Sequence, residues 1–250
     1  KSKGFILASK VDDAKSIGDE PFQYFSKFKN ISVAVDKKRR RGINKLIEHG
    51  VNLIILDDAF QHREVIPTYS LLLSDYSNLY FYDYLLPRGS LRESKKGSKR
   101  ADSIVITKCP ENFSQSDKNY LVDRIKLSSN QHIFFSKIKY SEELYSSSDT
   151  LNIMKLSNKK VNLVTGIVNS EVLIRFLEVK NITFEHFKYP DHFDYKEKDI
   201  LKFRDNITIT TEKDYSKLRK FNIENLYYLP ISVDILEEKI FIETIRDRIT

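Results

Sequence analysis

The sequence predicts an α/β fold with a mainly parallel sheet, and two observations predict it. Short apolar runs alternate with amphipathic stretches along the 250 residues. The run VNLIILD at 51–57 is almost continuously apolar, which is typical of a strand buried on both faces. Because 40% of the residues are hydrophobic, the chain can build a substantial core and does not read as disordered.

The first half of the chain supplies most of the predicted elements. Asp19 and Glu20 give one helix an acidic first turn, and Gly50 ends another. Apolar runs bounded by polar or turn-forming residues predict the strands. We expect strands at 5–8, 31–36, 51–57, 69–75, 79–83 and 101–107, and helices at 19–29, 42–50 and 114–127.

The second half reads as a smaller α/β unit that follows a linker. The composition becomes polar and serine-rich near 140–150, and the alternation of strands and helices then resumes. We therefore expect a core lobe at 1–140, a linker at 141–150 and a smaller lobe at 151–250. In the smaller lobe the predicted strands are 161–165, 182–187 and 206–214, and the predicted helices begin at Ser170 and near Lys196. A molecule with two lobes is expected to have its active site between them.

Composition and charge narrow the possible functions. The net charge of +7 suits a polyanionic partner such as nucleic acid, a phosphorylated substrate or an anionic lipid surface, but it equally suits a solvated lysine-rich surface. Cys109 is the single cysteine, so the chain has no internal disulfide and no cysteine metal cluster, which fits a reducing cytosol. No apolar run is long enough to span a bilayer, and no signal peptide is visible.

The stretch ILDDAFQHREV at 55–65 is the most informative motif. An apolar strand that ends in aspartate is a Walker B pattern, and ligands bind beyond the carboxyl ends of parallel strands. Asp57 and Asp58 together supply the hard oxygen ligands that Mg²⁺ prefers beside phosphates. The alternative is an aspartate that only stabilises a turn. The second carboxylate and the following Phe-Gln-His favour the functional interpretation.

The expected companion of a Walker B motif, a phosphate-binding G-x-x-x-x-G-K-[ST] loop, is absent because none of the seven glycines lies in such a run. Either the protein does not use a nucleotide, or the loop lies upstream of Lys1. The sequence opens KSKGF without a methionine, in the middle of a predicted strand, which favours the second explanation.

Other polar stretches add candidate residues. Asp19 of SIGDEP suits either a capping role or a general base at the start of a helix. His192 follows Pro190 in a short turn, where an imidazole can orient a carboxylate. In the basic loop 85–102, the lysines read as a solvated face, whereas the guanidinium of Arg92 suits phosphate oxygens.

Taken in order, GDEP, LDDAFQHR, LLPRGSLRE, TGIVNSE, PDHF and TTEKD make the chain resemble the tetraacyldisaccharide 4′-kinase family, from about residue 4 to about residue 230. The resemblance implies a P-loop-kinase-like core with a second lobe. It implies ATP- and Mg²⁺-dependent phosphorylation of the 4′-hydroxyl of a tetraacyldisaccharide 1-phosphate lipid A precursor. It also implies peripheral contact with the cytoplasmic face of the bacterial inner membrane and no nucleic-acid partner.

The same resemblance assigns roles to individual residues. Asp19 would be the catalytic base, and His192, from the second lobe, would hold it in place when the lobes close. Asp57 and Asp58 would serve the Mg²⁺ site. The residues expected to shape this site or to contact substrate and phosphate are Gln61, His62, Arg92 and Glu93.

The chain departs from the family pattern at several positions. Ala59 replaces a glycine, so this turn must tolerate a Cβ. Further departures occur at Arg88, Ser90, Val168 and Ser170. The residues that bind the nucleotide phosphates are not identified, because the family's Walker A loop is not in this sequence. The chain as given is therefore expected to bind ATP poorly and to transfer phosphate hardly at all.

Two other classes compete with this interpretation. One is another P-loop enzyme, although Pro110 occupies the position where a GTPase TKxD motif would carry its aspartate. The other is a degenerate, non-catalytic domain that binds anions. A nucleic-acid surface would interleave basic and aromatic residues, and the basic run at 37–41 does not.

Overall fold

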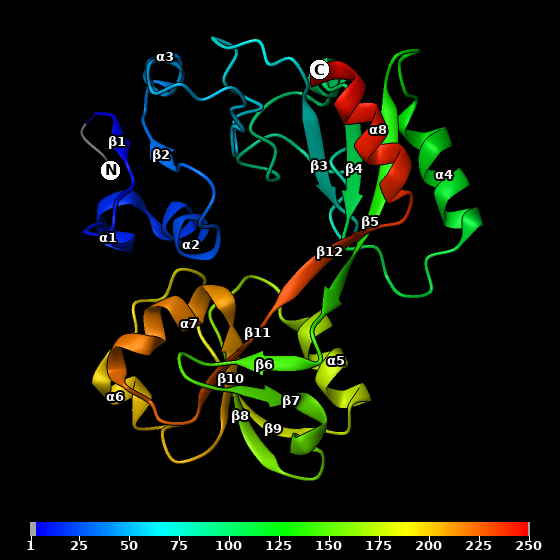
Figure 1. Cartoon of the computed structure of the whole chain (residues 1–250). Coiled ribbons are helices and arrows are strands. Elements are labelled where there is room, and N and C mark those ends of the chain that lie inside the picture. The colour runs from blue at the N-terminus through cyan, green and yellow to red at the C-terminus, as the bar shows by residue number, and fades with distance from the viewer. Residues whose placement is uncertain (1–3, 250) are drawn as a thin grey trace. The chain divides into compact units, whose positions relative to one another are not determined.

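The structure is a computed structural model that describes residues 4–249. The described chain forms two compact units (Figure 1). Unit 1 contains residues 4–6, 34–139 and 233–249, and unit 2 contains residues 7–33 and 140–232. Within 4–249, no helix combines the length and the apolar character needed to cross a membrane.

Unit 1 is built on a four-stranded sheet of order β12-β5-β4-β3. The strands are β3 (Leu71–Asp75), β4 (Ser103–Thr107), β5 (His132–Tyr140) and β12 (Ile231–Ile235), and β3, β4 and β5 run parallel. The side chains of β4 alternate between the two faces, as expected for a pleated strand. Ile104 and Ile106 pack with Leu121 of α4 (Gln115–Ile125). On β5, Phe134 contacts Phe241 of α8 (Glu238–Ile249), with ring centroids 5.0 Å apart.

Unit 2 is built on a six-stranded sheet of order β7-β6-β11-β10-β8-β9. Four neighbouring strands run parallel, from β11 inside the sheet to β9 at one edge: β11 (Leu226–Leu229), β10 (Thr208–Thr211), β8 (Lys160–Thr165) and β9 (Thr183–Lys188). Two short antiparallel strands, β6 (Glu143–Tyr145) and β7 (Thr150–Asn152), complete the other edge. Parallel strands need crossover connections, and helices between them provide these.

Helices cover both faces of the unit 2 sheet. Leu163 of β8 packs in one core cluster with Leu173 and Leu177 of α5 (Glu171–Val179). The next residue, Val164, packs in a second cluster with Leu218 of α7 (Glu212–Leu218). The second cluster also includes Ile200 of α6 (Glu197–Ile200). A parallel strand buried on both faces therefore accounts for the apolar run VNLVT.

The remaining elements lie outside the two main sheets. The two-residue strands β1 (Ile6–Leu7) and β2 (Ala34–Val35) pair with each other, and α3 (Arg39–Glu48) follows β2. The helices α1 (Ala14–Ile17) and α2 (Asp19–Lys27) belong to unit 2, where α2 packs against α7. Three 3₁₀ helices are η1 (Lys95–Arg100), η2 (Ile153–Leu156) and η3 (Arg219–Phe221).

The structure divides the chain differently from the lobes expected at 1–140 and 151–250. Residues 7–33 join unit 2 because α2 packs on α7, and 233–249 return to unit 1 because α8 packs on β5. The expected linker at 141–150 contains β6 and the start of β7, which pair with β11 and with each other. The serines at 146–148 lie in the β6–β7 turn, where the Ser146 hydroxyl accepts the Asp149 amide hydrogen.

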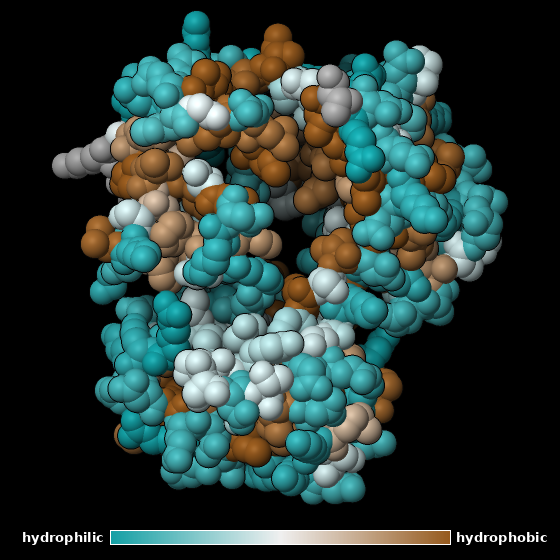
Figure 2. All heavy atoms as spheres, viewed as in Figure 1, coloured by the Kyte–Doolittle hydropathy of each residue, from teal (hydrophilic) through white to brown (hydrophobic). Residues whose placement is uncertain are grey.

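Two predicted strands of unit 1 are absent. Residues 51–57 form no strand in the described part of the chain, and the side chains of Leu53 and Ile55 are 59% and 87% exposed. Residues 79–83 form turns. An apolar run becomes a strand only when its backbone finds a neighbour to pair with, and β3 ends the sheet on this side. Figure 2 shows hydrophobic side chains gathered at the surface around β3 and the loops before it.

Candidate functional site

Asp19 is placed by a sharp change of direction between two helices. Gly18 ends α1 and begins α2 with φ +102°, a conformation that residues with a Cβ rarely adopt. Asp19 is then the first residue of α2, where the helix dipole favours a carboxylate. Its side chain is 23% exposed. The GDEP motif therefore delivers a fixed, partly accessible carboxylate.

His192 meets Asp19 inside unit 2. The imidazole Nδ1 lies 3.2 Å from Asp19 Oδ2. His192 has φ +59°, an uncommon value for a residue other than glycine, and its amide donates to Asp191 Oδ1 at 3.0 Å. The rings of Tyr189 and Phe193 pack 4.6 Å apart on either side of this turn. A backbone held in such a conformation is a frequent feature of functional sites.

The contact between Asp19 and His192 corrects the expectation that the two residues belong to different lobes. Residues 7–33 and 140–232 form the same unit, so no closure of lobes is needed to bring these side chains together.

A third side chain reaches the same carboxylate. Lys217 of α7 places its Nζ 3.0 Å from Asp19 Oδ2, and its side chain is only 14% exposed. Burial raises the pKa of Asp19, but the hydrogen bonds from Lys217 and His192 and the charge of Lys217 outweigh burial, so the pKa lies below its usual value. Asp19 is therefore ionised at neutral pH.

The TTEKD segment starts a helix and was predicted as the end of a strand. β10 ends at Thr211, whose hydroxyl accepts the amide hydrogen of Asp214 and so caps α7. Asp214 is fully buried. It accepts hydrogen bonds from the Gly166 amide at 2.8 Å, the Tyr195 hydroxyl at 3.1 Å and the Thr211 hydroxyl at 2.8 Å.

Gly166 of TGIVNSE is required by the close approach of Asp214. A Cβ at this position would lie 2.8 Å from Asp214 Oδ1 and 3.0 Å from the Tyr195 hydroxyl. Burial raises the pKa of Tyr195 far above its usual value, and the neighbouring Asp214 adds to the effect, so this hydroxyl stays a donor. Through its hydrogen bonds with Gly166 and Thr211, Asp214 thus connects the loop after β8 with the start of α7.

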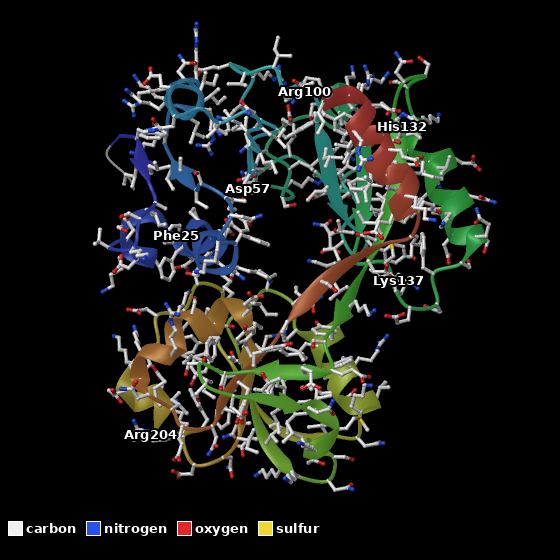
Figure 3. The ribbon with its side chains drawn as sticks, viewed as in Figure 1. Phe25, Asp57, Arg100, His132, Lys137 and Arg204 are labelled. Carbon is white, nitrogen blue, oxygen red and sulfur yellow. The ribbon has the colours of Figure 1, made fainter. Side chains whose placement is uncertain are left out.

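The DDAFQHR segment lies in unit 1, in the loop between α3 and β3, where Figure 3 labels Asp57. Asp57 and Asp58 are both exposed, and Asp58 has φ +45°. The left-handed residue of this turn is therefore Asp58, a residue type that tolerates the conformation, while Ala59 has an ordinary φ. The expected difficulty of replacing glycine by Ala59 does not arise.

Gln61 and His62 follow the aspartates. The Gln61 side-chain amide donates to the Asp58 carbonyl at 3.1 Å, so it stabilises the turn. His62 is exposed.

The LRE segment contacts the DDAFQHR loop through two ion pairs. Arg92 donates to Asp58 Oδ2 at 2.7 Å, and both side chains are mostly exposed. Glu93 lies between Arg100, at 2.8 Å, and Arg63, at 3.0 Å. The hydrogen bond from Arg100 is the main reason that the pKa of Glu93 lies below its usual value.

Arg100 extends this network to the backbone of the loop. It donates to the Phe60 carbonyl at 2.9 Å, and its guanidinium carbon lies 4.6 Å from the centre of the Phe60 ring. Arg100 is labelled in Figure 3. The two motifs are therefore held together by charged side chains.

The structure thus arranges the predicted residues in two groups. Unit 2 holds Asp19 and His192 in contact. Unit 1 holds the group formed by Asp57, Asp58, Gln61, His62, Arg92 and Glu93. Among the described residues, no group of three or more His, Cys, Asp or Glu side chains is arranged to bind a metal ion.

Sequence reasoning missed several partners of these residues. Lys217 and Lys213 contact the Asp19–His192 pair, and Arg63 and Arg100 contact Glu93. The spacing of Lys213 and Lys217 on one helix is a signal that could have been found, but the expected strand at 206–214 concealed the helix. The partners of Glu93 give no comparable signal, since Arg63 is 30 residues away in the chain.

The whole chain, residues 1–250, matches the family model described as tetraacyldisaccharide-1-P 4′-kinase. It is 41% identical over 251 residues to the tetraacyldisaccharide 4′-kinase of Flavobacterium psychrophilum, covering 96% of this chain and 73% of that protein. The tetraacyldisaccharide 4′-kinase of Bacteroides fragilis is 36% identical, with 95% of this chain and 70% of that protein covered.

A solved structure is also similar. The crystal structure of LpxK from Aquifex aeolicus in complex with ATP superposes with a TM-score of 0.76 at 25% sequence identity. The match covers 100% of this chain and 76% of that one. The likeness confirms the predicted α/β, P-loop-kinase-like fold. By sequence and by structure, the chain belongs to the tetraacyldisaccharide-1-phosphate 4′-kinase family.

Proposed function

We propose that this chain transfers the terminal phosphate of ATP to the 4′-hydroxyl of a tetraacyldisaccharide 1-phosphate, a step in lipid A biosynthesis. Family membership supports the reaction and its substrates. The single observation that carries the catalytic assignment is the contact between His192 Nδ1 and Asp19 Oδ2. A carboxylate fixed by an imidazole at a helix start, and still partly accessible, is suited to accept a proton from a hydroxyl.

Asp19 acts as the general base in this proposal. The sugar hydroxyl loses its proton to Asp19 as its oxygen bonds to phosphorus, and the bond between phosphorus and the leaving ADP oxygen breaks. A carboxylate with a lowered pKa is a weak base, so it takes the proton while the new bond forms and not before. A base of this kind contributes about 10²–10⁴-fold to the rate.

His192 orients Asp19. Its left-handed backbone sets where the side chain starts, and the contacts of Nδ1 with Asp19 and of Nε2 with Lys213 orient the ring. Asp19 Oδ2 accepts hydrogen bonds from both His192 and Lys217. We assign Oδ1 to the substrate hydroxyl.

Asp57 and Asp58 have the donor chemistry that Mg²⁺ requires. They are consecutive exposed carboxylates, and Asp58 already faces a cationic group, the guanidinium of Arg92. Two carboxylates without a third protein ligand suit an ion that takes its other ligands from phosphate oxygens and water. When bound, Mg²⁺ neutralises charge on the transferring phosphate.

The residues around Asp57 and Asp58 have two roles: some stabilise the loop, and others are placed to contact phosphate. Gln61 supports the turn through the Asp58 carbonyl, and Glu93 orders Arg100 and Arg63. Arg92 and His62 are exposed beside the aspartates, so we assign them contacts with phosphate oxygens.

The substrate also suggests where the protein works. It is an anionic glycolipid, and the chain carries a net charge of +7. We propose peripheral contact with the cytoplasmic face of the inner membrane, where basic side chains are attracted to anionic lipids.

The test is ATP-dependent phosphorylation of a tetraacyldisaccharide 1-phosphate by the full-length gene product and by Asp19→Asn. We expect kcat to fall by about 10²–10⁴-fold with little change in ATP affinity. The control is Asp205→Asn, an exposed aspartate in the turn after α6, which should leave kcat unchanged. Unchanged turnover in Asp19→Asn would remove Asp19 from the mechanism, and no transfer by the unaltered protein would support a non-catalytic anion-binding domain.

A further inference from the structure

Two lysines of α7 lie one helical turn apart and both reach the Asp19–His192 pair. Side chains at positions i and i+4 of a helix share a face, and Lys213 and Lys217 have this spacing. Lys213 Nζ lies 2.9 Å from Asp191 Oδ1 and 3.4 Å from His192 Nε2. Lys217 Nζ lies 3.0 Å from Asp19 Oδ2. One short helix thus contacts both members of the pair.

Of the two side chains that donate to Asp19, Lys217 lowers the pKa of this carboxyl group more than His192 does. Burial of Asp19 has the largest effect on its pKa and raises it, and the largest opposing influence is the hydrogen bond from Lys217, ahead of that from His192. The 14% exposure of the Lys217 side chain limits screening by water. The Lys217 hydrogen bond therefore opposes the effect of burial on the pKa of Asp19 more than the His192 hydrogen bond does.

The direction of the contacts also constrains the carboxylate. Lys217 and His192 bind the same oxygen, Oδ2, from two different segments of unit 2. Two donors on one oxygen restrict rotation of the carboxylate about its Cβ–Cγ bond. A fixed orientation is what proton transfer to a carboxylate needs.

Lys213 acts on the imidazole in a similar way. Two groups face His192 Nε2: the Lys213 ammonium at 3.4 Å, which only donates hydrogen bonds, and Asp191 Oδ2 at 3.6 Å, whose carboxylate is already paired with Lys213. The closer ammonium favours the tautomer in which Nε2 accepts and Nδ1 carries the hydrogen. Nδ1–H then donates to Asp19 Oδ2. The backbone amide of His192 donates to Asp191, which Lys213 also binds.

We propose that Lys217 is a positioning residue for Asp19, holding the carboxylate oriented for the substrate hydroxyl, with Lys213 holding the tautomer of His192. This inference rests on the proposed function, because it gives the lysines a role through the catalytic base. The charged groups that face Asp19 are His192 from the turn before α6 and Lys217 from α7. Among the described side chains of α1, which also packs on α2, none makes an ion pair with Asp19.

The test compares Lys217→Met with Lys217→Arg in the full-length gene product. Methionine keeps the apolar length of the side chain and removes its charge, whereas arginine keeps the charge. The matched control is Lys202→Met, an exposed lysine that follows α6. The measurements are kcat and KM for both substrates as a function of pH.

We expect Lys217→Met to lower kcat by about 10-fold at neutral pH, where Asp19 stays ionised, because the carboxylate loses one of the two donors that orient it. The acidic limb of the pH profile should move up by about one pH unit, because the loss of a nearby opposite charge raises the pKa of a carboxylate. KM for ATP should stay unchanged. Lys217→Arg should recover most of the activity, and Lys202→Met should behave as the unaltered protein.

A purely structural role for Lys217 would lower the amount of folded protein without moving the pH profile, and that result would overturn the inference. A second measurement is independent of phosphate transfer. The carboxyl resonance of Asp19, assigned by its loss in Asp19→Asn, is titrated by NMR in the unaltered protein and in Lys217→Met. An upward shift of about one unit is expected, and an unchanged titration rejects the inference even if the proposed function fails.

Discussion

Replacing Asp214 by alanine should destabilise unit 2 strongly, and the structure gives the size of the effect. The fully buried carboxylate accepts hydrogen bonds from the Gly166 amide and the hydroxyls of Tyr195 and Thr211. A buried donor left without an acceptor costs about 1–3 kcal/mol. Because hydroxyl groups can rotate and the amide cannot, we expect a total loss of about 3–5 kcal/mol in the free energy of unfolding.

Asp214→Asn should cost less than the alanine variant. Its remaining oxygen can still accept from Gly166 and Thr211, and its amide group can donate to the Tyr195 hydroxyl. The hydrogen bonds lose their charge assistance, which roughly halves their strength, so we expect a loss of about 1–2 kcal/mol.

Urea-induced unfolding checks both values. The chain contains no tryptophan, so circular dichroism and the fluorescence of its 14 tyrosines report the transition. Asp205→Ala, at an exposed aspartate, should shift the midpoint hardly at all. A loss below about 1 kcal/mol for Asp214→Ala, or a larger loss for Asp214→Asn than for Asp214→Ala, would refute the reasoning.

Two further predictions concern charged pairs of unit 1. A hydrogen bond from Arg41 at 2.7 Å is the main reason that the pKa of Asp36 lies below its usual value. The pair therefore stabilises the folded protein at pH values above the pKa that Asp36 has in the unfolded chain. This stabilisation is lost as the pH falls through the pKa that Asp36 has in the folded protein. Arg41→Met should therefore lower stability at pH 7, and the difference should shrink below about pH 4 in urea titrations at both pH values. Arg92→Met should change the free energy of unfolding by less than about 1 kcal/mol, because the ion pair of Arg92 with Asp58 is exposed. The same variant should lower kcat/KM for phosphate transfer by about 10-fold. A loss of activity that is matched by the loss of folded protein would argue for a structural role alone.

The sequence was sufficient to predict the elements whose own residues determine them. Helix 114–127 was predicted from its pattern and was found at Gln115–Ile125, where Ser114 and Asp117 form a capping box. The strand at 161–165 is Lys160–Thr165, buried on both faces of its sheet. The contact between Asp19 and His192 agrees with the pairing that the family resemblance implied.

Other features depend on partners that the local sequence does not reveal. The apolar run 51–57 has the composition of a strand, but a strand also needs a paired neighbour, and the described chain provides none. Lys217 lies 198 positions from Asp19, and only the packing of α2 on α7 brings them together. The assignment of 7–33 to unit 2 follows from the same packing.

Unit 2 is built from two separate stretches of the chain, and this limits which fragments of the protein can be expressed with the site intact. Residues 7–33 and 140–232 are separated by the main part of unit 1, yet Asp19 comes from the first stretch and His192 from the second. An excised fragment that begins at residue 140 would keep the imidazole and both lysines of α7 but lose the carboxylate they serve. A fused fragment joining 7–33 to 140–232 would keep Asp19, which we propose as the proton acceptor, together with His192 and both lysines.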